Sequence, residues 1–155
     1  MIVDGYNVIF AWGFDTQSLP DARQKLLEML DDYAGYSGEC ITVVFDGYRT
    51  RSAGSQMRHG LIDVVFTAYG VTADTHIQRL VKSGEGHQKV VTGDYLEQLS
   101  VFGSGAVRIT PAELKAMIAF EREKHVARLH RSSLEGRALK KRLRLDAISQ
   151  KQHDR

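Results

Sequence analysis

The strongest constraint on the fold of this chain is a regular alternation between short apolar segments and longer segments with helical periodicity. The apolar segments are rich in Val and Ile and have the length of buried strands. Alternation of this kind predicts a parallel β-sheet whose two faces are both covered by helices. The predicted strands are the opening run that ends at Asp4 and the segments 41–47, 61–68, 88–94 and 106–110.

Helical patterns occupy most of the intervening sequence. They run over 18–34, over 71–83 with Thr72 as N-cap, and from the capping motif TPAE at 110–113 to about residue 131. Ser132 and Glu135 form a second capping pattern, which predicts a separate basic helix over 133–150. Residues 48–60 contain glycine, serine and three arginines, and we expect them to form a loop.

Charge is distributed unevenly along the chain. Residues 1–120 carry 10 Lys and Arg against 14 Asp and Glu, a net charge of −4, whereas residues 121–155 carry 11 against 5, a net charge of +6. An acidic body with a basic tail indicates a negatively charged partner for the tail. We expect one domain over 1–131 and a basic helical extension over 132–155.

Composition excludes several classes of protein. With 43% hydrophobic and 26% charged residues in 155, the chain is neither a disordered tail nor a collagen-like rod. Its only cysteine, Cys40, can form no internal disulfide, which fits a reducing compartment. Apolar runs are too short to span a membrane, and the opening MIVDGYN lacks the pattern of a signal peptide. We expect a cytoplasmic protein, or one in an organelle of bacterial descent, with no membrane partner.

Aspartates mark the ends of three predicted strands. Asp4, Asp46 and Asp94 end the first, second and fourth strands, and Asp74 lies in the first turn of a predicted helix. In open α/β sheets, ligands bind beyond the carboxyl ends of the strands. A strand order of 3-2-1-4-5 would bring Asp4 and Asp94 to the same crevice, with Asp46 beside Asp4. Each aspartate taken alone also fits a turn or a helix cap.

Clustered carboxylates imply a cation. Several ionised carboxylates at one crevice repel one another unless a cation neutralises them. Oxygen ligands of this kind suit Mg²⁺ or Mn²⁺, which activate water for attack on a phosphodiester. The residues alone therefore favour metal-dependent phosphodiester hydrolysis. An aspartyl-phosphate phosphatase is disfavoured, because it would carry a second aspartate where this chain has Tyr6.

Most of the chain resembles a known family. The similarity is carried, in order, by VDGYNVIFAW at 3–12, VVFDG at 43–47, VVFTAYGVTADTHIQRL at 64–80, VVTGDYLEQ at 90–98 and FGSGAVRITPAEL at 102–114. These segments resemble the YacP-like NYN family of PIN-like nucleases, which includes ribosome-associated bacterial endoribonucleases. The resemblance implies a PIN-like, Rossmann-like three-layer α/β/α fold with strand order 3-2-1-4-5, and a divalent-metal-dependent ribonuclease.

The same resemblance implies roles for individual residues. Catalytic roles carry over onto Asp4, Asn7, Asp46, Asp74 and Asp94. Of these, Asp4, Asp74 and Asp94 are the expected ligands of Mg²⁺ or Mn²⁺, whereas Asp46 and Asn7 are candidates for positioning other ligands. The chain departs from the family at one place: Gly93 stands where relatives often have serine, which removes a hydroxyl beside the last aspartate.

Basic residues outside the acidic crevice are candidates for binding RNA. They are Arg49, Arg51 and Arg58 in the predicted loop, and Lys140, Lys141, Arg142 and Arg144 in the tail. Lys and Arg side chains bind nucleic acid chiefly by neutralising backbone phosphates. The alternative is that these are ordinary solvated surface charges. From the residues and the resemblance together, we expect a metal-dependent endoribonuclease that hydrolyses RNA, including ribosome-associated mRNA; the alternative is a non-catalytic RNA- or ribosome-binding module with the same fold.

Overall fold

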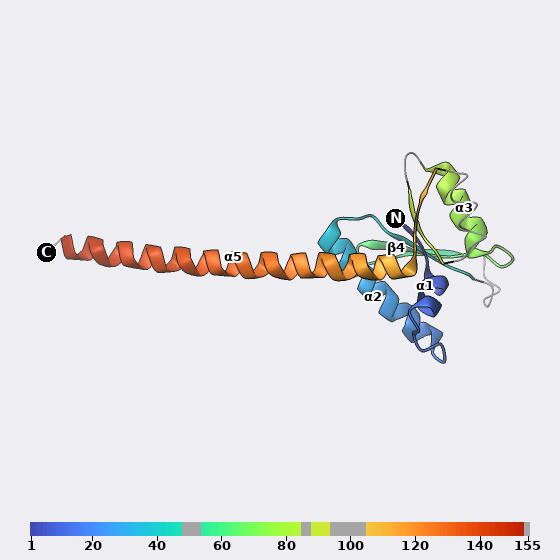
Figure 1. Cartoon of the computed structure of the whole chain (residues 1–155), viewed down its shortest axis with the longest axis horizontal. Coiled ribbons are helices and arrows are strands. Elements are labelled where there is room, and N and C mark those ends of the chain that lie inside the picture. The colour runs from blue at the N-terminus through green and yellow to red at the C-terminus, as the bar shows by residue number, and fades with distance from the viewer. Residues whose placement is uncertain (48–53, 85–87, 94–104, 154–155) are drawn as a thin grey trace. The chain divides into compact units, whose positions relative to one another are not determined.

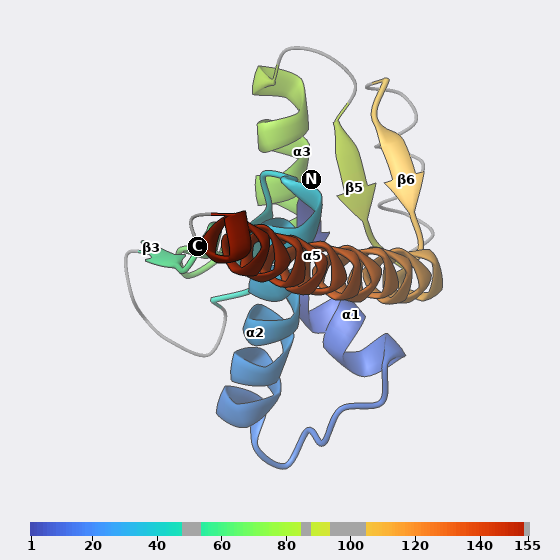
Figure 2. The same cartoon turned by 90° about the vertical axis from the view of Figure 1, so that its left-hand side faces the viewer.

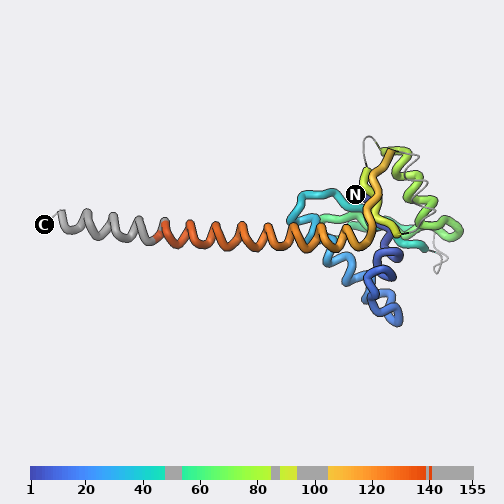
Figure 3. Tube along the Cα trace, in the orientation of Figure 1, coloured from blue at the N-terminus to red at the C-terminus, as the bar shows by residue number. Residues whose placement is uncertain are grey.

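The computed structural model of the chain describes residues 1–47, 54–84, 88–93 and 105–153 (Figure 3). The side chains of residue 139 and of residues 141–153 are not among those it describes. The described residues divide into two compact units, 1–119 and 120–155, which we take in turn.

The first unit is built on a six-stranded sheet with the order β3-β4-β2-β1-β5-β6. Its strands are β1 (Ile2–Asp4), β2 (Thr42–Phe45), β3 (Ser55–His59), β4 (Ile62–Phe66), β5 (Lys89–Val91) and β6 (Val107–Ile109). Every pairing is parallel except that of β3 with β4. Figure 2 shows β5 and β6 running side by side in the same direction. The five parallel strands have the predicted 3-2-1-4-5 order.

Strand β3 was not predicted. Residues 55–59 were expected to be loop, but they form an antiparallel edge strand on β4, with Ser55 opposite Phe66 and His59 opposite Ile62. The side chains from Ser55 to Arg58 are exposed. An edge strand exposed on both faces has no alternation of apolar and polar residues, which is the signal that would have identified it.

Helices cover both faces of the sheet, as predicted. On one face, α1 (Gly5–Ala11), α2 (Leu19–Ser37) and the first turns of α5 (Pro111–His153) pack on Val3, Val43 and Val91. On the other face, α3 (Ala73–Ser83) packs on Ile2, Val44 and Val90. Figure 1 and Figure 2 both show α3 on the opposite side of the sheet from α1 and α2. Neighbouring strand residues thus alternate between two separate cores.

The predicted helices over 18–34 and 71–83 are confirmed as α2 and α3. Thr72 caps α3, because its hydroxyl accepts a hydrogen bond from the backbone N–H of Thr75 (3.2 Å). Helix α2 ends at Gly38, which adopts the left-handed conformation (φ 72°) that terminates many helices. Both helices bury an apolar face against the sheet.

Helix α5 corrects a second expectation. The sequence predicted a helix to about residue 131 and a separate one over 133–150, but the chain forms one continuous helix of 43 residues. The pattern at Ser132 and Glu135 lies inside this helix and does not begin a new one. In the second unit, the described apolar side chains are exposed, including Val126, Leu129 and Leu134. No helix among the described residues is long and apolar enough to cross a membrane.

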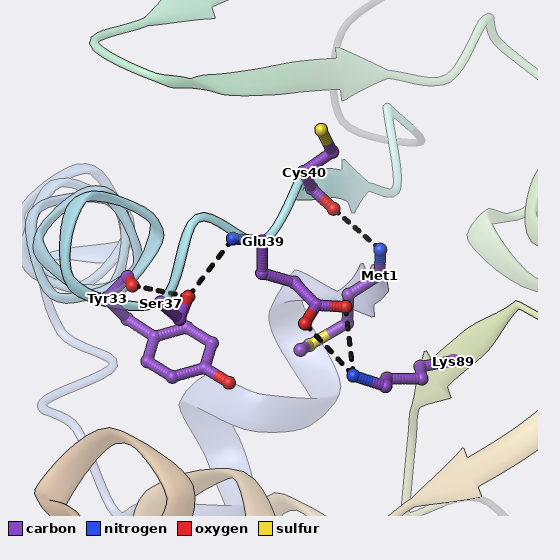
Figure 4. A network of polar contacts seen from close by, with 6 residues as sticks. All are labelled: Met1, Tyr33, Ser37, Glu39, Cys40 and Lys89. Atoms are coloured by element: carbon purple, nitrogen blue, oxygen red, sulfur yellow. Dashed lines mark hydrogen bonds and ion pairs between the residues drawn. The ribbon is translucent and has the colours of Figure 1, made fainter. Parts of the chain in front are cut away.

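A polar network joins three segments at the amino-terminal edge of the sheet (Figure 4). Lys89 at the start of β5 forms an ion pair with Glu39, with Nζ 2.9 Å from Oε2. The terminal amino group of Met1 donates a hydrogen bond to the carbonyl oxygen of Cys40 (2.6 Å). These contacts connect the starts of β1 and β5 to the segment before β2.

Candidate active site

Asp4 lies at the end of the central strand β1 and is also the N-cap of α1. Its carboxylate accepts a hydrogen bond from the backbone N–H of Asn7 (3.0 Å), which satisfies one of the free donors in the first turn of the helix. Only 8% of Asp4 is exposed, and it is the one buried Asp or Glu among the described residues. A carboxylate is rarely buried to this extent unless it has partners or a function.

Helix α1 follows β1 without a loop because of Gly5. A Cβ atom at Gly5 would lie closer than 3.0 Å to the buried ring of Phe45 on β2. Glycine therefore allows the chain to turn from strand to helix directly above β2. The sequence Asp-Gly was predicted only to break the strand, so this helix was missed.

Asn7 links the ends of β1 and β5. Its side-chain oxygen accepts a hydrogen bond from the backbone N–H of Gly93 (2.7 Å), two residues beyond the end of β5. A Cβ atom at position 93 would lie 2.9 Å from that same oxygen. Asn7 thus holds the backbone of Gly93 close to the start of α1. The side chain of Asn7 can approach this closely because Gly93 has no side chain.

Asp46 directly follows β2, the neighbour of β1, and is half-buried. The turn after it is closed by a hydrogen bond from the backbone N–H of Gly47 to the hydroxyl of Thr67 (2.9 Å), a buried residue just after β4. A Cβ atom at Gly47 would overlap the carbonyl oxygen of Thr67. Glycine at this position therefore holds the ends of β2 and β4 together beside Asp46.

Asp74 comes from the other layer of the fold. It occupies the first turn of α3, next to the N-cap Thr72, and is half-buried. A carboxylate there is stabilised by the positive end of the helix dipole. None of Asp4, Asp46 and Asp74 is without an interaction partner. Asp94, the remaining predicted ligand, lies outside the described residues.

The described part of this edge supplies oxygen donors but not a complete metal cage. Within residues 1–47, 54–84, 88–93 and 105–153, no three His, Cys, Asp or Glu side chains form a group that could hold a metal ion. The donors present are carboxylate and amide oxygens, which are the ligands of hard cations. Mg²⁺ commonly uses one or two protein carboxylates and completes its shell with water and substrate. The donor set therefore fits Mg²⁺ or Mn²⁺ in its chemistry.

Of the predicted RNA-binding residues, the structure describes the side chains of Arg58 and Lys140. Arg58 lies on β3 opposite Asp63, one pair from the turn at Gly60, with its Nη1 atom 3.9 Å from Oδ1 of Asp63. It also donates to the carbonyl oxygens of Gly60 and Leu61, away from the acidic edge. Arg49 and Arg51 lie outside the described residues. Lys140 is exposed on α5, and the side chains of Lys141, Arg142 and Arg144 are not described.

The sequence did not predict a cavity that is lined by Gly93 together with residues of β6 and α5. It has a volume of about 440 Å³, and Trp12, Arg108 and Lys115 are among its lining residues. The indole N–H of Trp12 donates to the carbonyl oxygen of Pro111 (2.8 Å), so this side chain ties α1 to the start of α5. Because the residues that meet here are 99 positions apart in the chain, no local pattern could have indicated the contact.

The sequence matches the family of YacP-like NYN domains over residues 1–154. The chain belongs to this family. The NYN domain is a PIN-like nuclease family, and membership supports a nuclease-type function on RNA. The family expected from the sequence motifs is thereby confirmed.

A homologous sequence and two crystal structures also support the assignment of this chain to the family. The uncharacterized protein YacP of Bacillus subtilis (strain 168) is 33% identical over 121 residues, which cover 74% of this chain and 71% of that protein. The crystal structure of Rae1 (YacP) from Bacillus subtilis superimposes with a TM-score of 0.72 at 29% identity, covering 96% of this chain and 89% of that one. A tryptophan-to-leucine mutant of Rae1 gives a TM-score of 0.71 at 30% identity, over 85% and 82%. The similarity in structure covers most of the chain, so the NYN fold is supported by more than the sequence motifs.

Proposed function

We propose that this NYN domain is a divalent-metal-dependent endoribonuclease that hydrolyses phosphodiester bonds of single-stranded RNA, including mRNA presented by the ribosome. The observation that supports this most directly is the burial of Asp4 at the carboxyl end of the central strand. Burying a carboxylate costs free energy, and the hydrogen bond that Asp4 accepts from the N–H of Asn7 serves helix α1 as its cap. In a family of nucleases, such a residue is best explained by catalysis.

Asp4, Asp74 and Asp94 would hold the cation. A bound Mg²⁺ or Mn²⁺ ion supplies Lewis acidity toward the phosphodiester and its attacking water. Asp46, at the adjacent strand end, is suited to orient a water molecule or a ribose hydroxyl by accepting its hydrogen bond. Asn7 positions the turn that leads into residue 94 through its contact with Gly93.

The basic tail is assigned to the delivery of substrate. The side chains of Lys140, Lys141, Arg142 and Arg144 would lie within about one and a half turns of α5 and carry four positive charges. Such a segment binds phosphates without sequence preference and in a salt-dependent manner. We assign it to ribosomal RNA or to a long RNA substrate.

A cleavage assay tests the proposal. The purified chain is incubated with end-labelled single-stranded RNA in Mg²⁺, in Mn²⁺ or in EDTA, and internal products are resolved on a sequencing gel. We expect cleavage with metal that is lost in EDTA and in Asp74→Asn. The matched control is Asp63→Asn, which removes the same charge from an exposed site next to Arg58.

Two results would overturn the assignment. Cleavage by Asp74→Asn at the wild-type rate under saturating metal would remove that residue from the site. RNA binding without cleavage in either metal would favour the second candidate, a non-catalytic RNA- or ribosome-binding module. Co-sedimentation with ribosomes, before and after the four tail residues are changed to glutamine, tests the role of the tail separately.

A further inference from the structure

A second cavity opens on the α3 side of the sheet. It lies between α3 and the edge formed by β3 and β4, and its volume is about 310 Å³. Both polar and apolar side chains line it. The residues used below are Ser55, Gln56, Thr67, His76 and Arg79. We call this cavity the α3 groove.

Two nitrogen-bearing side chains of α3 line the groove together. His76 and Arg79 are three residues apart and therefore share one side of the helix. The adjoining side of α3 is fixed to the sheet by the buried residues Ala73, Ile77 and Val81. The backbone positions of the two basic residues are thus set by a packed element and not by a loop.

Neither basic side chain forms an ion pair with a carboxylate of the described residues. Among the described residues that line the α3 groove there is no Asp or Glu, and neither His76 nor Arg79 forms an ion pair within the described part of the chain. Two other arginines of the domain have partners: Arg58 contacts Asp63, and Arg23 donates to the hydroxyl of Tyr6 (2.9 Å). An arginine that forms no ion pair with any residue of the described ranges, beside a histidine in a domain with net charge −4, is available to an anion from outside.

The α3 groove begins at the acidic edge. Thr67, one of its lining residues, directly follows β4 and binds Gly47, the neighbour of Asp46. At the other wall, His76 is two residues beyond Asp74 on the same helix. The groove therefore borders the strand end next to Asp46 and the helix that carries Asp74.

We propose that the α3 groove binds one nucleotide of single-stranded RNA adjacent to the cleaved bond, with Arg79 and His76 contacting its phosphate. The proposal rests on the proposed function for the identity of the ligand. Guanidinium and imidazole N–H groups form charge-assisted hydrogen bonds to phosphate oxygens. The amide of Gln56 and the hydroxyl of Ser55 supply donors and acceptors for the base or the ribose 2′-hydroxyl. A duplex is too wide for a cavity of about 310 Å³.

Binding without cleavage tests this directly. The affinity of the full chain for a fluorescent single-stranded RNA is measured by anisotropy in EDTA over a range of salt concentrations. We expect Arg79→Gln to weaken binding about tenfold, and to reduce the slope of log K against log salt by about 0.7, the value for one phosphate contact on a single strand. We expect His76→Gln to weaken binding by a smaller factor, with both variants melting at the wild-type temperature.

The matched control is Lys82→Gln. Lys82 is an exposed cation on the same helix that does not line the groove, so its removal changes the net charge equally. An equal loss of affinity in Lys82→Gln, or an unchanged affinity and salt slope in Arg79→Gln, would overturn the proposal. Equal binding of duplex RNA, equally weakened by Arg79→Gln, would overturn the single-strand assignment.

The outcome is separable from that of the nuclease assay. If the wild-type chain binds RNA through Arg79 but cleaves none in Mg²⁺ or Mn²⁺, the catalytic proposal fails and the α3 groove stands. If the chain cleaves RNA and Arg79→Gln has wild-type affinity, the α3 groove fails and the catalytic proposal stands.

Discussion

Asp4 carries two roles that two substitutions separate. As the N-cap of α1 it accepts a hydrogen bond from the N–H of Asn7, and as a carboxylate it contributes charge to the acidic edge. Asparagine caps a helix about as well as aspartate but is neutral, whereas alanine does neither. Asp4→Asn therefore removes the charge alone, and Asp4→Ala removes both the charge and the cap.

The expected magnitudes differ for stability and for activity. Loss of an N-cap costs about 1 kcal/mol, which corresponds to a fall in melting temperature of about 3 °C for a chain of this length. Asp4→Asn should stay within about 0.5 kcal/mol of the wild-type free energy of unfolding, because the cap persists. Both variants should lose about a hundredfold in cleavage rate, equivalent to about 2.7 kcal/mol of transition-state stabilisation.

Thermal unfolding followed by circular dichroism, together with cleavage of labelled RNA in Mn²⁺, measures both quantities on the same preparations. A rate for Asp4→Asn within threefold of wild type would refute the catalytic role of the charge. A destabilisation of Asp4→Asn equal to that of Asp4→Ala would refute the capping argument.

The remaining predictions concern packing, pH and the tail. Gly5→Ala should destabilise the domain by about 1–3 kcal/mol in denaturant unfolding, since its Cβ would meet the buried ring of Phe45, and Phe45→Leu in the same chain should restore part of the loss. Hydrogen bonds from the backbone N–H and the hydroxyl of Thr110 lower the pKa of Glu113 in the folded chain. The ionised Glu113 therefore stabilises the fold above the pKa of the unfolded chain, and this stabilisation is lost as the pH falls through the pKa of the folded chain. Glu113→Gln should reduce this part of the pH dependence of the melting temperature. Deletion of 133–155 should leave the melting temperature nearly unchanged, because no described residue of that range belongs to either core cluster, and should lower affinity for long RNA in a filter-binding assay.

The sequence predicted the parallel framework of the fold because the parallel strands are short and rich in Val and Ile, and four of them, β1, β2, β4 and β5, are mainly buried. The helices α2 and α3 were predicted for a similar reason, since each has a capping residue and one apolar face. Strand β3 was missed because it is exposed and lacks alternation. The continuity of α5 was missed because Ser132 and Glu135 resemble a helix start, and a capping pattern cannot show whether the preceding helix has ended.

The candidate site was predicted only in part. Strand ends bring Asp4 and Asp46 to one edge, as expected from topology alone. The link between Asn7 and Gly93 spans 86 residues and depends on the missing side chain of Gly93, so no local sequence pattern could predict it. Arg58 was predicted to bind RNA because of its charge and its arginine neighbours. In the structure, the register of β3 against β4 places it opposite Asp63, which it contacts.

The position of β1 in the sheet has a consequence for protein synthesis. This strand is made first, yet both of its hydrogen-bonding partners, β2 and β5, are made later, the second about 90 residues downstream. The hydrogen bond from the indole N–H of Trp12, at the end of α1, to the carbonyl oxygen of Pro111 also requires a residue that is made much later. Contacts between residues so distant in the chain form late in folding. The link between Asn7 and Gly93 at the acidic edge can therefore form only after β5 has left the ribosome.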